Sequence, residues 1–168
     1  MKVPQEPFIP DPKSSNFVYQ VTQVLRKIAI SLNLLVDGVF DSNIKAKGSI
    51  LSSGTSGIGY TTGAGGTITQ LTNKSTPVTL NTPTGQITMN NASLAANTNV
   101  SFTFNNSIIG ANDIVNVQVN WGANLGAYQV WVGSIGAGAC NIIIRNTTTG
   151  ALSDAVVIQY AIIKGATS

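Results

Sequence analysis

The fold is decided by residues 100–132, which read VSFTFNNSIIGANDIVNVQVNWGANLGAYQVWV. Three segments in this stretch, 100–104, 115–119 and 128–132, alternate apolar with polar residues. A period of two residues places one face of a strand in a core and leaves the other face polar. The segments between them contain Asn and Gly, which favour turns. Residues 100–132 therefore predict three β-strands joined by short connections.

Further strand-like runs extend this pattern through most of the chain. They are Thr67–Leu71, Val78–Leu80, Gln86–Met89, Asn141–Arg145 and Val156–Ile163. Many short strands separated by turn residues are typical of two antiparallel sheets packed face to face. We therefore expect a mainly β fold, with residues 67–168 forming an antiparallel, jelly-roll-like β-sandwich.

An amphipathic helix is predicted before the β region, over residues 15–39. Its apolar residues follow one another in steps of three and four: Val18, Val21, Leu25, Ile28, Leu32, Leu35 and Val39. This is the seam of a coiled coil, and Leu at one core position with Ile at the other favours three or more strands. We expect this seam to be the interface of a trimeric bundle. The alternative, packing against the chain's own β region, is disfavoured by the Gly- and Ser-rich connector at 40–66.

The first segment, residues 1–14, contains four prolines and suits an extended arm without internal hydrogen bonds. Its two large apolar side chains, Phe8 and Ile9, are the candidate anchors for docking on another protein. A disordered arm is the alternative. The arm's acidic and proline residues do not resemble a secretory signal.

Composition argues against catalysis. The chain of 168 residues has nine Lys and Arg, six Asp and Glu, one Cys and no His. These numbers exclude a His base, a His metal ligand, an intrachain disulfide and a Cys-rich zinc site. We expect no enzyme, no cofactor and no metal. The net charge of +3 reflects few acids and not a basic patch, so we expect no nucleic-acid partner. The apolar run near 28–36 is too short to span a membrane.

A few residues could still carry chemistry or binding. Asp37, Asp41, Asp113 and Asp154 are the acids available for hydrolysis or calcium binding, and we interpret Asp113 and Asp154 as turn residues. Trp121 and Tyr128, with Trp131, could stack on a sugar, although aromatic residues in β domains are more often core. Cys140 is expected to be a small core residue.

Several short motifs between residues 57 and 165 resemble a β domain found in virion proteins of tailed bacteriophages and prophages. They are GYTTG at 59–63, GGT at 65–67, Lys74-Ser75, GQITM at 85–89, Asn106-Ser107, Arg145-Asn146 and AIIKG at 161–165. In that group such domains occur in fibres, spikes and decoration proteins, commonly as trimers. None of these motifs is a catalytic signature.

The resemblance implies a non-enzymatic structural protein on the surface of a virion, assembled in the bacterial cytoplasm. We expect a homotrimeric short head or neck fibre, or a capsid decoration protein. Its arm and helix would attach to capsid, portal, neck or tail proteins, and the β domain would project. The alternative is a receptor-binding tail-fibre tip that holds a host surface glycan through Trp121 and Tyr128.

Overall fold

The computed structural model describes residues 18–28, 47, 49, 51, 55, 57–122, 124 and 126–167. The chain divides into two units, Met1–Thr55 and Ser56–Ser168. The boundary falls inside the Gly- and Ser-rich connector expected at 40–66.

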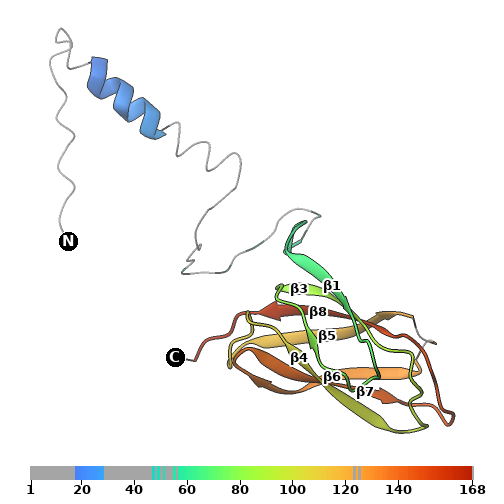
Figure 1. Cartoon of the computed structure of the whole chain (residues 1–168). Helices are drawn as coiled ribbons and strands as arrows, with labels where there is room; N and C mark the ends of the chain where they lie inside the picture. The colour runs from blue at the N-terminus through green and yellow to red at the C-terminus, as the bar shows by residue number, and fades with distance from the viewer. Residues whose placement is uncertain are drawn as a thin grey trace. The chain divides into compact units, whose positions relative to one another are not determined.

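In the first unit, residues 18–28 are helical (Figure 1). This segment lies within the expected helix and carries its first four seam residues. The hydroxyl of Thr22 donates to the carbonyl oxygen of Val18 at 2.7 Å, one helical turn earlier. In the part of the chain that the structure describes, no helix is long and apolar enough to cross a membrane.

The second unit is a β domain of eight strands (Figure 1). The strands are β1 (Gly65–Thr69), β2 (Val78–Thr79), β3 (Thr84–Thr88), β4 (Asn99–Asn105), β5 (Ile114–Trp121), β6 (Tyr128–Gly136), β7 (Ala139–Asn146) and β8 (Val157–Ile163). The alternating segments 100–104, 115–119 and 128–132 lie in β4, β5 and β6, as predicted.

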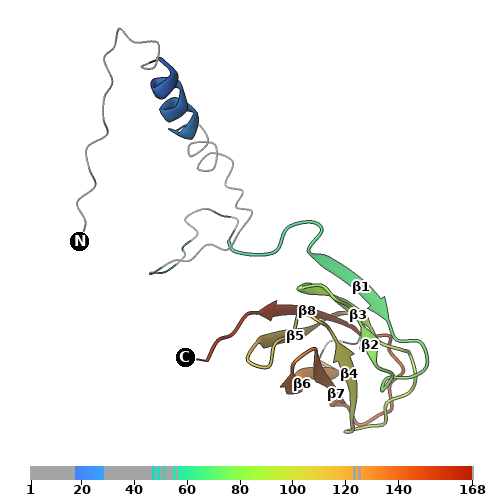
Figure 2. The ribbon, with the colours of Figure 1, turned by 60° about the vertical axis from the view of Figure 1, so that its left-hand side comes forward.

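The strands form two four-stranded sheets, with the orders β1-β3-β8-β5 and β2-β4-β7-β6. Figures 1 and 2 show them as two layers, with β8 and β5 in one and β4, β6 and β7 in the other. The first six strands alternate between the two sheets along the chain. The chain is therefore a two-sheet, mainly β protein with a short N-terminal helix.

The expectation of purely antiparallel sheets is wrong, because both sheets are mixed. β1 pairs with β3 in parallel, and β2 pairs with β4 in parallel. Parallel neighbours need a connection that crosses over and returns. Here β2, in the other sheet, lies on the crossover between β1 and β3, and β3 lies on the crossover between β2 and β4. The remaining pairs are antiparallel.

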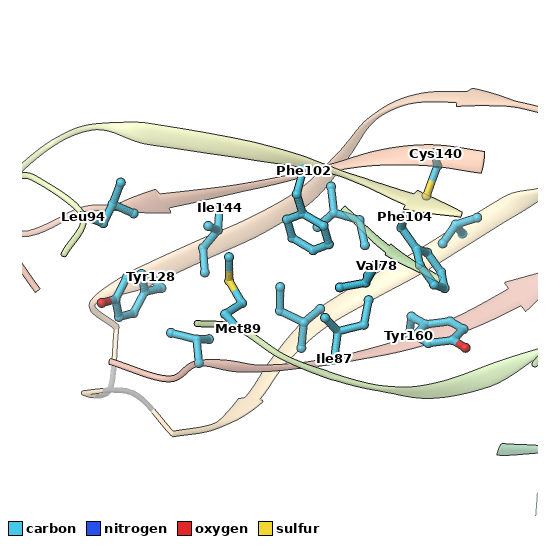
Figure 3. Close-up of a cluster of buried hydrophobic side chains, with 14 of the residues drawn as sticks. Val78, Ile87, Met89, Leu94, Phe102, Phe104, Tyr128, Cys140, Ile144 and Tyr160 are labelled. Carbon is cyan, nitrogen blue, oxygen red and sulfur yellow. The ribbon is translucent and has the colours of Figure 1, made fainter. Parts of the chain in front are cut away.

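Side chains from both sheets form one hydrophobic cluster (Figure 3). Phe104 of β4 and Tyr160 of β8 face each other in it, with ring centroids 4.7 Å apart. Ile87 and Ile142 are completely buried, and Cys140 is buried as expected. The labelled tyrosines lie at opposite ends, with the hydroxyls of Tyr128 and Tyr160 pointing away from the middle of the cluster.

Two buried asparagines close the loops around this core. Asn146 is fully buried, and its amide donates to the carbonyl oxygens of Leu94, Ala95 and Gly150 at 2.7–3.2 Å. Asn106 is also fully buried and donates to the carbonyl oxygen of Thr82 at 2.8 Å. A buried amide is tolerated only where such bonds replace those to water.

Candidate functional site

The helix carries the first candidate surface, an apolar stripe that we call the helix seam: Val18, Val21, Leu25 and Ile28. All four are exposed, Val18 at 65% and Leu25 at 58%. Aliphatic side chains at this spacing form one apolar stripe, and covering the stripe with another surface would be favourable because it removes apolar area from water. Tyr19 and Val24 are also exposed and widen the apolar surface.

The remaining residues expected at this interface lie outside the described residues. They are Leu32, Leu35 and Val39, and the expected docking residues Phe8 and Ile9 lie there too.

The second candidate surface is a hollow beside the end of β5, which we call the Trp121 hollow. It has a volume of about 320 Å³ and is lined by Val119, Asn120, Trp121, Gly122, Asn124, Gly126 and Tyr128. The structure thus brings Trp121 and Tyr128 to the same hollow. Trp131 does not line it, because it comes three residues after Tyr128 in β6, and alternation turns its side chain to the opposite face of that strand.

The two aromatic residues of this hollow have different surroundings. Trp121 is 67% exposed, so its ring is available for stacking. Tyr128 is only 8% exposed and belongs to the core, so its ring offers no stacking face. Its hydroxyl is buried too, near the carboxylate of Asp154. Tyr128 therefore forms part of the wall of the hollow and offers a ligand neither an exposed ring nor an exposed hydroxyl.

The position of Trp121 depends on the local backbone. The pairing of β5 with β8 shifts between Val119 and Trp121, and Trp121 lies opposite Val157. The next residue, Gly122, has a φ of +81°, and a side chain there would come within 2.5 Å of the carbonyl oxygen of Ala155. Only glycine fits such a position without strain. The strand therefore turns immediately after Trp121.

Near Tyr128 lies a buried lysine, with the half-buried Asp154 beside it, whose burial the sequence analysis did not predict. Lys74 is 3% exposed, and its ammonium donates to the carbonyl oxygens of Asn90 at 2.7 Å and Asp154 at 2.6 Å. Burial lowers the pKa of Lys74, and the charge of Asp154 partly opposes this. Burial, and then the charge of Asp154, raises the pKa of Tyr128 to about 12, so the phenol is neutral. In the sequence analysis, Lys74 appeared only in the Lys74-Ser75 motif, one of the motifs that resemble those of virion proteins.

Asp113 is held at a turn, which agrees with its interpretation from the sequence. Its carboxylate accepts hydrogen bonds from the backbone of Gly110 at 2.8 Å and Gly165 at 3.0 Å, and pairs with the ammonium of Lys164. The bonds from Lys164 and from these backbone groups lower the pKa of Asp113 to about 2. Within the described ranges, no three His, Cys, Asp or Glu residues gather at a site that could hold a metal ion.

Comparison with known proteins finds no matching family model, no matching curated protein and no matching solved structure.

Proposed function

We propose that this chain is a non-enzymatic structural protein of a bacteriophage virion, a homotrimeric short head or neck fibre or a capsid decoration protein. The arm and the helix attach it to capsid, portal, neck or tail proteins. The β domain, a jelly-roll-like sandwich in this proposal, projects from the particle surface.

The observation that carries the proposal is the exposed helix seam. Val18, Val21, Leu25 and Ile28 follow an a/d spacing, and nothing on the described part of the helix covers them. Burying one such side chain contributes about 1.5–3 kcal/mol. Three copies multiply this gain, and the Leu and Ile at the core positions favour a bundle of three or more helices.

The test is the mass of the full chain in solution. Light scattering should give about three times the 17.4 kDa of one chain. Leu25→Asp/Ile28→Asp places charges in the seam and should give monomers. Gln20→Asp/Gln23→Asp adds the same charges to the same helix outside the seam and should leave the trimer intact. A wild-type monomer, or equal masses for the two variants, contradicts the proposal.

The Trp121 hollow favours a second candidate function, a tail-fibre tip that binds a host surface glycan. An exposed indole beside the exposed amides of Asn120 and Asn124 offers stacking and hydrogen bonding to a neutral sugar. A glycan array with the wild type, Trp121→Ala and Trp131→Ala separates the two functions. Binding lost only in Trp121→Ala favours the tip, and no binding by the wild type favours the structural role.

A further inference from the structure

One sheet of the β domain contains no charged residue in any of its strands. The sequences of β1, β3, β5 and β8 are GGTIT, TGQIT, IVNVQVNW and VIQYAII. In the other sheet, β7 carries Arg145, which is exposed. We call the outward side of the sheet β1-β3-β8-β5 the neutral face.

The middle of the neutral face is a row of uncharged polar side chains. Thr67, Gln86, Gln159 and Gln118 lie directly opposite one another across the four strands. A side-chain amide both donates and accepts hydrogen bonds. The row can therefore form hydrogen bonds with the same row of a second copy, and no charged group is needed for them.

An exposed aliphatic pair lies near one end of the face. Ile114 of β5 and Ile163 of β8 are paired in register, and they are 60% and 56% exposed. Their neighbours Val115 and Ile162 are buried in the core, so alternation turns Ile114 and Ile163 outward. Ile114 and Ile163 therefore form a small exposed apolar patch near one end of the neutral face.

The neutral face is also hollowed. Two depressions of about 130 and 470 Å³ share Thr84 and Gln159 in their walls. The backbone of Gly65, Gly66 and Gly85 forms part of the wall of the larger one. These hollows can receive long side chains from a facing surface.

We propose that the neutral face is where the β domains of neighbouring copies meet, turned toward the threefold axis of the trimer. This rests on the proposed homotrimer and adds a second contact to the helix seam. Around a threefold axis every charge is repeated three times, so like charges meet and lose water. The uncharged strands avoid both costs, and the Lys164–Asp113 pair at the edge of the face is already neutralised, whereas the other sheet would bring three copies of Arg145 together.

The chain connectivity agrees with this choice of face. β1 is the first strand after the connector and forms one edge of this sheet. Copies joined at their helices are therefore tethered through the edge strand of the neutral face. A charged partner protein fits less well, because its charges would face amides without a counter-charge.

The experiment compares two cysteine variants of the full chain. Gln118→Cys lies on the neutral face, and Gln129→Cys lies on the outward side of the other sheet, and both glutamines are exposed in the isolated chain. Their alkylation by a bulky maleimide is followed by mass spectrometry, while light scattering gives the mass of each sample. We expect Gln118→Cys to react at least tenfold more slowly than Gln129→Cys in the trimer. The two rates should become equal when Leu25→Asp/Ile28→Asp is added.

Equal rates in an intact trimer overturn the neutral-face contact and leave the helix trimer standing. A monomeric wild-type chain with equal rates overturns both. Gln118→Lys and Gln129→Lys give a second readout that needs no labelling. Gln118→Lys should weaken the trimer at micromolar concentration and Gln129→Lys should not, and the reverse result also overturns the contact.

Discussion

The side-chain nitrogen of Lys74 lies 2.6 Å from the main-chain oxygen of Asp154 and 2.7 Å from that of Asn90. One buried ammonium thus ties together three loops that are distant in the sequence. Hydrogen bonds to a charged group contribute more than those between neutral groups. Lys74 therefore has a structural role in the end of the β domain near Tyr128.

We expect Lys74→Met to lower the free energy of unfolding by about 2–4 kcal/mol, because it leaves two partly buried carbonyl oxygens without a donor. Urea denaturation measures the change. Lys47→Met, at an exposed lysine, is the control and should stay within about 0.5 kcal/mol of the wild type. Equal effects of the two substitutions would refute the role of Lys74.

The lowered pKa of Asp113 predicts how the free energy of unfolding changes with pH. Its pKa falls from 3.8 to about 2 on folding, chiefly through its bond from Lys164. A carboxyl with a lowered folded pKa stabilises the fold above its unfolded pKa, and this contribution disappears as the pH falls through the folded value. The urea midpoints of the wild type and Asp113→Asn should differ at pH 6 and converge by about pH 2. A difference that does not change with pH would contradict this role.

The close approach of β1 and β3 at Gly85 predicts that a side chain at this position destabilises the domain. A Cβ there would come within 2.5 Å of the carbonyl oxygen of Gly66 and 3.1 Å of Tyr160. We expect Gly85→Ala to destabilise the domain by about 2–4 kcal/mol, as overpacking does in a tight interior. Gly150→Ala meets nothing within 4 Å and is the matched control in thermal unfolding. Equal melting temperatures would show that the two strands do not approach so closely.

The burial of Cys140 predicts that its thiol reacts slowly with a disulfide reagent in the folded protein. Burial raises its pKa to about 11, so the native thiol is almost entirely protonated at pH 8. A disulfide reagent should label the folded protein much more slowly than the protein in denaturing urea. Fast labelling without denaturant would mean that the edge of the core near Cys140 opens readily.

Much of the fold follows from local pattern. Strict alternation predicted the strands at 100–104, 115–119 and 128–132, because side chains on a half-buried strand repeat every two residues. Alternation could not predict that β1 pairs with β3 and β2 with β4 in parallel. They depend on how the chain crosses between sheets, and β2 has only two residues, Val78 and Thr79.

The candidate sites were only partly predictable. The sequence favoured core positions for the aromatic residues, with exposure of Trp121 beside Gly122 as the alternative, and the structure exposes Trp121. The ring of Tyr128 is buried because alternation along β6 turns it toward the core, and the sequence alone left that open. Lys74 was missed because a lone lysine between turn residues normally lies in solvent.

The central claim is that copies of this chain cover one another's helix seams. Sedimentation equilibrium of the full-length chain over a wide concentration range tests it most directly. We predict a single species of three times the 17.4 kDa chain mass at micromolar concentration, which dissociates only on dilution. A species of one chain mass at every concentration would contradict the account.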